Sequence, residues 1–174
     1  EGAQGENIAA PDKAVAVLCH FPGQVQPVSG LEAGDVEISE RTLREVYLPP
    51  WVEGIKNSGA LGVMAMYPAI DGVPVHASKF LLTDVLREEL GFDGLVLSEG
   101  GGFLGFAGIF SSSGEDVYSL RKLAGAKILK AGVDVDIFNV HQDFFGNFDR
   151  TVLVYQYFGV EPVEGFPCFG HLDS

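Results

Sequence analysis

The fold of this protein is decided by residues 61–98, LGVMAMYPAIDGVPVHASKFLLTDVLREELGFDGLVLS. Two short apolar runs, 61–66 and 94–98, lie at the ends of this stretch, and each has the length of a strand. Between them the apolar residues follow helical spacing, at Leu81, Leu82, Val85, Leu86 and Leu90. Ser78 and Gly91 are typical of the two ends of a helix. The stretch therefore predicts a βαβ unit whose strands are parallel and joined by a right-handed crossover.

The same alternation continues on both sides of this unit. Further strand-like runs lie at 14–18 and 133–137, and helical patterns follow Ser39 and span 113–132. The Pro49–Pro50 pair is expected to end or kink the first of these helices. The first three of the four runs lack polar alternation, which favours a sheet covered on both faces. The pattern predicts an α/β fold, either an open doubly wound sheet or part of an eight-stranded barrel.

The composition excludes a nucleic-acid-binding protein. The 174 residues carry 11 Lys and Arg against 24 Asp and Glu, a formal net charge of −13, whereas a phosphate backbone requires a basic surface. Hydrophobic residues make up 47% and charged residues 20% of the chain, which is typical of a globular domain. No apolar run approaches the ~20 residues that span a bilayer. No basic segment precedes an apolar one at the start, so we expect neither a membrane span nor a signal peptide.

The first residue and the cysteines bear on the cellular compartment. Residue 1 is Glu rather than Met, so we expect a processed product or a fragment. Cys19 and Cys168 either pair in a disulfide or remain two buried free thiols. The compartment therefore stays open, with a secreted or periplasmic location as one hypothesis.

Two stretches resemble the catalytic barrel of glycoside hydrolase family 3, the β-glucosidase-like family. They are residues 38–51, ISERTLREVYLPPW, and residues 63–99, from Val63 through the Ser98-Glu99 pair. The resemblance implies that residues 1–137 form a half (β/α) barrel that corresponds to the second half of the family's catalytic barrel. Residues 138–174 hold nine of the chain's aromatic residues. We expect this segment to be an extension that packs on the same domain or on a partner.

The resemblance also implies a nucleophile. Barrel active sites lie at the carboxyl ends of the strands, and the family's nucleophile is an Asp that follows a Ser. Here Glu99 follows Ser98 at that place, and Gly100 stands where the family has an aromatic residue. The resemblance therefore makes Glu99 the candidate nucleophile of a retaining glycosidase, which uses two carboxyl groups. Tyr67 is implied to support it with a hydrogen bond, and its alternative is a core tyrosine.

The substrate-binding residues implied by the family are altered at one position. Cys19-His20-Phe21 stands where the family has Lys-His-Phe, so a thiol replaces the cation. His20 is implied to bind sugar hydroxyls, with Cys19 beside it, and Met64 is either a substrate wall or a core residue. Nothing in the sequence is assigned as the general acid.

Three functions fit these residues. The first is retaining hydrolysis of β-glucosides, without a cofactor or metal ion. The second is a non-catalytic scaffold or assembly subunit derived from the glycosidase fold, and the third is a sugar-binding module without hydrolysis. In each case we expect a homo-oligomer or a companion chain that completes the barrel, because a half barrel leaves sheet edges exposed.

Overall fold

The computed structural model of the protein describes residues 2–24, 26–100, 102 and 117–135. The chain divides into two units, Glu1–Val140 and His141–Ser174, and all described residues belong to the first. The predicted aromatic-rich extension, its boundary at residue 138 and Cys168 lie outside the described residues. Within the described residues, no helix is long and apolar enough to cross a membrane.

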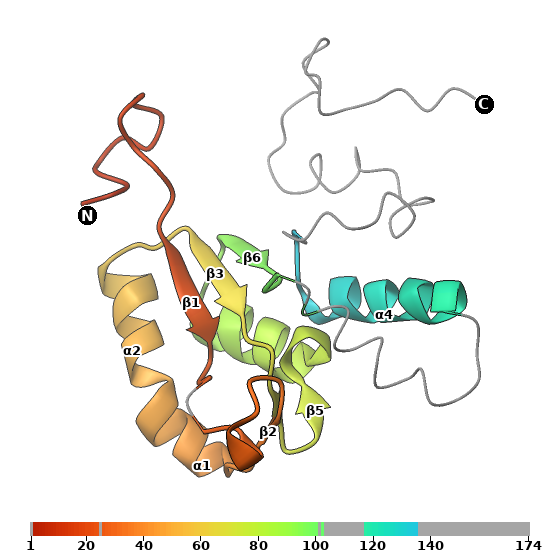
Figure 1. Ribbon diagram of the computed structural model, residues 1–174. Coiled ribbons are helices and arrows are strands. Elements are labelled where there is room, and N and C mark those ends of the chain that lie inside the picture. Colours follow the sequence, from red (N-terminus) through yellow and green to blue (C-terminus); the bar gives the residue numbers. More distant parts are fainter. Residues whose placement is uncertain (1, 25, 101, 103–116, 136–174) are drawn as a thin grey trace, which may run out of the picture. The chain divides into compact units, whose positions relative to one another are not determined.

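The main sheet is parallel, as the sequence predicts (Figure 1). It has the order β1-β3-β6, formed by β1 (Val17–Phe21), β3 (Gly62–Ala65) and β6 (Leu95–Leu97). Val135 continues the parallel order through a single bridge to Leu97. The α/β class with parallel strands is therefore confirmed.

The first strand begins later than predicted. The sequence places it at 14–18, whereas β1 starts at Val17 and pairs with β3 as far as Phe21. The preceding residues have other partners: the amide of Ala14 bonds to the Ala3 carbonyl, and that of Ala16 bonds to Oε1 of Gln4. Both amides already have hydrogen-bond acceptors in the N-terminal segment, so residues 14–16 are not part of β1.

The two faces of the sheet differ in exposure within the described residues. One row, Leu18, Val63 and Val96, faces the helices, and Val63 and Val96 are fully buried. A Cβ atom on Gly54 would lie 2.6 Å from Cδ1 of Leu18, so this row packs closely against the helix that carries Gly54. The next row, Cys19, Met64 and Leu97, is exposed or partly exposed. Alternate residues of a strand face opposite sides, so the second side of the sheet is open within the described residues.

Residues 40–57 form one helical stretch between β1 and β3. Its pieces are α1 (Glu40–Thr42), η2 (Leu43–Tyr47), α2 (Pro49–Val52) and η3 (Glu53–Asn57), where η2 and η3 are π-helical. Ser39 caps it as predicted, because its Oγ accepts the amide of Thr42 at 3.2 Å. The proline pair does not end the stretch: Leu48 keeps helical angles and Pro49 begins the next piece, where a missing amide costs no hydrogen bond.

Trp51 joins this helical stretch to the end of β1. Its ring packs edge-to-face on Phe21 with centroids 5.0 Å apart. Its Nε1 donates to the carbonyl oxygen of Pro22 at 2.9 Å. Both contacts fix the segment that follows His20, at the end of the sheet where the sequence places the site.

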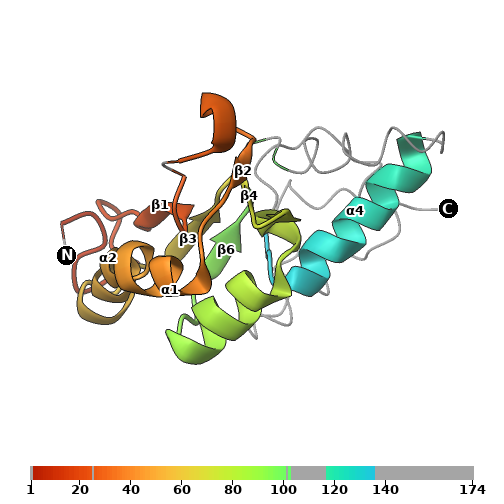
Figure 2. The ribbon, with the colours of Figure 1, turned by 90° about the horizontal axis from the view of Figure 1, so that it is seen from below.

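The helix of the βαβ unit is η5 (Phe80–Glu89), and Figure 2 shows it on the same side of the sheet as α1 and α2. The five predicted apolar positions, Leu81, Leu82, Val85, Leu86 and Leu90, are buried. Ser78 Oγ accepts the amide of Leu81, and Gly91 has a φ of 72°, so both predicted ends are confirmed. Helix α4 (Val117–Ala131) lies in the helical pattern predicted at 113–132, of which residues 113–116 lie outside the described residues.

A second, smaller sheet follows the carboxyl ends of the main strands and was not predicted. Its order is β2-β4-β5, from β2 (Asp35–Val36), β4 (Ala69–Ile70) and β5 (Val73–Pro74). The β4–β5 hairpin turns at Asp71 and Gly72, whose φ values are 49° and 76°, as a two-residue turn of this hand requires. The 3-10 turn η4 (Val75–Ala77) follows directly and leads into η5.

A partly buried ion pair connects η5 to the far end of the main sheet. Nη2 of Arg87 lies 2.7 Å from Oδ2 of Asp134, and the same oxygen accepts the amide of Val96 at 2.7 Å. The two side chains are only 20% and 16% exposed. Asp134 therefore joins the helix to β6.

Replacing Asp134 by Ala should lower the free energy of unfolding by about 2 kcal/mol, because Arg87 loses its charged partner and the amide of Val96 loses its acceptor. Urea denaturation measures this loss. The control is Asp84→Ala, which removes the exposed partner of Lys79 on the same helix and should cost less than about 1 kcal/mol. Equal losses in the two variants would contradict a structural role for the partly buried pair.

Candidate active site

Glu99 lies just beyond the carboxyl end of β6, and its carboxylate is held on both oxygens. Oε1 is 3.1 Å from Nε2 of His20, which belongs to β1. Oε2 accepts the main-chain amide of Tyr67, which follows β3, at 3.0 Å. The residue is only 8% exposed. Three neighbouring parallel strands therefore deliver Glu99, His20 and Tyr67 to one place.

Tyr67 contacts Glu99 through its main chain. Its amide, not its hydroxyl, donates to the carboxylate. The hydroxyl donates instead to the carbonyl oxygen of Gly100. The pKa of this phenol is raised, first by burial and then by the charges of Glu99 and Glu32. The phenol therefore stays protonated and acts as a donor to the chain just beyond Glu99.

Cys19 and Met64 lie together on the open side of the sheet. The Cys19 Sγ atom is 4.0 Å from Sδ of Met64, and Cys19 is exposed. Burial and the negative charge of Glu99 raise the pKa of the Cys19 thiol. The thiol is therefore uncharged at neutral pH, so it does not replace the positive charge of a lysine.

Opposing effects act on the pKa of the Glu99 carboxyl group, and the result is a raised value. Burial raises it most strongly, and the charge of Glu32 adds to the increase. The positive charge of His20, the amide of Tyr67 and a hydrogen bond from the side chain of Gln24 lower it. The carboxylate is thus removed from water yet supplied with donors, as expected of a tuned reactive group.

Three of the residues that act on Glu99 were missed by sequence reasoning. Gln24 and Glu32 lie in the segment between β1 and β2, where no pattern identifies a function. His76 is buried, and its Nε2 accepts the main-chain amide of Glu99 at 3.1 Å. Burial lowers the pKa of His76 to about 4. In the sequence, His76 appears only as one of several histidines without metal-ligand spacing.

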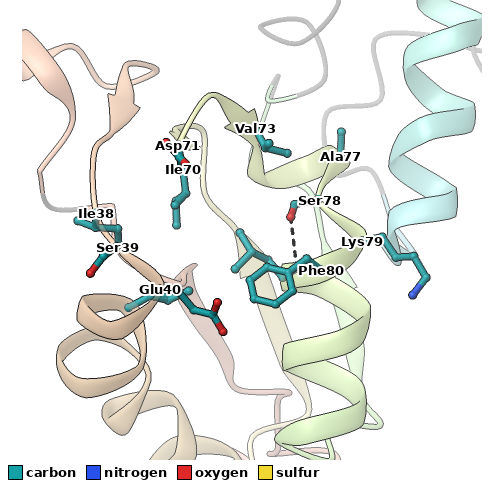
Figure 3. A pocket seen from close by; sticks show the side chains of 12 residues that line it. Ile38, Ser39, Glu40, Ile70, Asp71, Val73, Ala77, Ser78, Lys79 and Phe80 are labelled. Atoms are coloured by element: carbon teal, nitrogen blue, oxygen red, sulfur yellow. Dashed lines mark hydrogen bonds between the residues drawn. The ribbon is translucent and has the colours of Figure 1, made fainter.

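Away from Glu99, the described part of the chain has a surface pocket but no cluster of metal ligands. No group of three or more His, Cys, Asp or Glu residues there is arranged to hold a metal ion. A surface pocket of about 400 Å³ lies between the start of α1 and the start of η5. Figure 3 shows Ser39 and Glu40 on one side of it and Ser78 and Phe80 on the other. Glu99 does not line this pocket.

Comparison with known proteins identifies the family. A model of the family described as "Glycosyl hydrolase family 3 N terminal domain" matches residues 1–147. The chain belongs to glycoside hydrolase family 3. This confirms the family resemblance of residues 38–51 and 63–99.

Named members of family 3 are similar to large parts of this chain. A β-xylosidase of Formosa agariphila is 38% identical over 139 residues, which are 79% of this chain and 18% of that protein. A β-glucosidase of Rhizobium radiobacter is 39% identical over 98 residues, which are 56% of this chain and 11% of that protein. The solved structure of a Listeria innocua β-glucosidase in complex with glucose has a TM-score of 0.68 and 28% identity, covering 89% of this chain and 20% of that one. This family 3 chain therefore spans about a fifth or less of the length of these relatives.

The stability of the family 3 chain should depend on pH through His76. The unfolded chain binds a proton at His76 below pH 6.5, the ordinary value, whereas the folded chain binds it only near pH 4. The free energy of unfolding should therefore fall by about 3 kcal/mol as the pH drops from 6.5 to 4, because the unfolded state binds more protons over this range.

Urea denaturation of the wild type and of His76→Gln at several pH values isolates this effect. The variant lacks the titrating imidazole, so its stability should fall less steeply between pH 6.5 and 4. Parallel curves for the two proteins would contradict a low pKa for His76.

Proposed function

We propose that this chain carries the nucleophile of a retaining β-glycosidase that hydrolyses β-glucosides. One observation supports this most directly: Glu99 is a buried carboxylate at the carboxyl end of a parallel strand, with His20 on one oxygen and the Tyr67 amide on the other. The β-glucosidase relatives favour a β-glucoside as the substrate.

In the proposed reaction, Glu99 attacks the anomeric carbon of the sugar. A new bond forms between a carboxylate oxygen and that carbon while the bond to the leaving oxygen breaks, and a second carboxyl group protonates the leaving oxygen. Water then gives a proton to the second carboxylate, which restores that group, while the water oxygen bonds to the same carbon and the bond to Glu99 breaks, leaving Glu99 with its original charge. The Tyr67 amide and His20 orient the carboxylate before attack. Because the nucleophile is already in place, less entropy is lost on reaching the transition state, and the activation free energy is lower.

In this proposal, His20 contacts both Glu99 and the sugar. Its Nε2 is occupied by Glu99 at 3.1 Å, so Nδ1 is the atom left to hydrogen-bond a sugar hydroxyl. The side chain is 33% exposed, which leaves one side of the ring accessible. Cys19 and Met64, on the open side of the sheet, are proposed to contact the sugar without charge.

We also propose that the sheet is half of a (β/α) barrel completed by a second copy or a companion chain. The row of Cys19, Met64 and Leu97 is exposed or partly exposed, as expected of a barrel interior that lacks its other half. Within the described residues, β1 pairs only with β3, so its outer edge is free to accept a strand.

The alternative is a non-catalytic scaffold or assembly subunit. It is favoured by the uncharged Cys19 thiol at the position of the family's lysine and by Glu99, which is one methylene longer than the family's Asp. A third candidate is a sugar-binding module, which predicts that glucose binding measured by calorimetry weakens in His20→Ala. Absence of any heat with the wild type would rule out the third candidate.

Replacing Glu99 by Gln should lower kcat for 4-nitrophenyl β-glucoside by about 1,000-fold or more, because the amide cannot form the covalent intermediate. Release of nitrophenol measures this rate. The control is Glu45→Gln, at an exposed carboxyl group on η2 that pairs with Arg41. Turnover that survives in Glu99→Gln would remove Glu99 from the mechanism, and an inactive wild type that forms a large oligomer would favour the scaffold.

Replacing Glu32 by Gln should lower the pKa of Glu99, because one of the two effects that raise it is a negative charge on Glu32. The ionised nucleophile then persists to lower pH, so the acid limb of the kcat/KM profile should move to lower pH. Glu37→Gln, on the exposed segment after β2, is the control and should leave this limb in place. An unchanged limb in Glu32→Gln would show that Glu32 does not act on Glu99.

A further inference from the structure

We propose that His76 is a positioning residue for Glu99: its imidazole holds the main-chain amide of Glu99 and so determines where the carboxylate lies. This proposal rests on the proposed role of Glu99 as nucleophile and adds a residue that touches no substrate. It follows from the contacts of the segment between β3 and η5, which reaches Glu99 at two separate points.

The first observation is the contact itself. His76 lies in η4 and is 1% exposed, and its Nε2 accepts the amide of Glu99 at 3.1 Å. An imidazole nitrogen that accepts a hydrogen bond carries no proton, so the proton of the neutral ring is on Nδ1. The bond therefore needs an acceptor at this position and not only a side chain of suitable volume.

The second observation is the close fit of the chain around the imidazole. A Cβ atom on Gly102 would lie 2.4 Å from Cε1 and 2.6 Å from Nε2 of His76. The amide of Gly102 also donates to the carbonyl oxygen of Glu99 at 2.9 Å. The main chain of Glu99 is thus held at its amide by His76 and at its carbonyl by Gly102.

The third observation is that one hairpin provides both contacts. Tyr67 precedes β4 and binds the Glu99 carboxylate through its amide, while His76 follows β5 and binds the Glu99 amide. The hairpin is closed by main-chain bonds, including that from the amide of Val75 to the carbonyl of Pro68 at 3.3 Å. The Tyr67 amide and the His76 imidazole therefore keep a set spacing, and loss of His76 removes the contact that holds the main chain of Glu99 while Tyr67 still binds its carboxylate.

The test measures the titration of the Glu99 carboxyl group by carbon NMR of the full chain labelled in glutamate, with the resonance assigned from Glu99→Gln. In His76→Leu, which removes the acceptor, the carboxylate should move toward water and titrate at a lower pH than in the wild type. In His76→Gln, whose amide oxygen replaces Nε2 as acceptor, the titration should match the wild type. Gly102→Ala displaces the ring without changing it and should shift the titration in the same direction. This variant keeps the test possible if His76→Leu fails to fold.

A buried control separates positioning from general destabilisation. Val85→Ala removes a fully buried side chain on η5 and should lower the melting temperature without changing the titration of Glu99. The proposal is overturned if His76→Leu or Gly102→Ala leaves the titration unchanged, or if Val85→Ala shifts it equally. Because this measurement needs no turnover, it stands apart from the Glu99→Gln test of the proposed function.

Activity provides a second readout with 4-nitrophenyl β-glucoside. His76→Leu should lower kcat about 100-fold with little change in KM, because a displaced nucleophile affects the reaction more than ground-state binding. His76→Gln should recover most of this loss. Equal kcat values in the Leu and Gln variants would overturn the proposal.

Discussion

The structure of this site depends on the burial of one carboxyl group at the end of a parallel sheet. A carboxylate that is 8% exposed must replace its lost water with donors from the protein. The amide of Tyr67 and the side chain of His20 supply these donors, and both come from strands adjacent in the sheet order. The parallel pairing of β1, β3 and β6 therefore does more than form the core, because it places the donors around the charge.

The small second sheet sets the path of the chain between two residues that contact Glu99. Its strands are only two residues long, and the β4–β5 hairpin lies between Tyr67 and His76. The hairpin turn at Asp71 and Gly72 reverses the chain, so that both ends of the segment meet the residue at the end of β6. A site built on such a closed segment holds its geometry better than one built on an open loop.

The sequence predicted the regular parts of this fold well. Helical spacing and the cap residues Ser78 and Gly91 defined η5, and the strand–helix alternation defined the parallel order. The resemblance to family 3, together with the rule that barrel active sites lie at the carboxyl ends of the strands, brought Glu99, His20 and Tyr67 together in the prediction. The small sheet was missed because two-residue strands have no periodicity, and β1 was placed too early because its start is decided by bonds to the N-terminal segment.

By itself, the sequence determined the order of strands and helices, the ends of η5 and the acid that follows β6, because these depend on residues close together in the chain. Only the tertiary structure decided that the Tyr67 amide, and not its hydroxyl, binds Glu99, and that His76 holds the Glu99 amide. These bonds join residues that are 32 and 23 positions apart. Their direction, and the burial that raises one pKa and lowers another, depend on packing between distant segments, which local patterns do not encode.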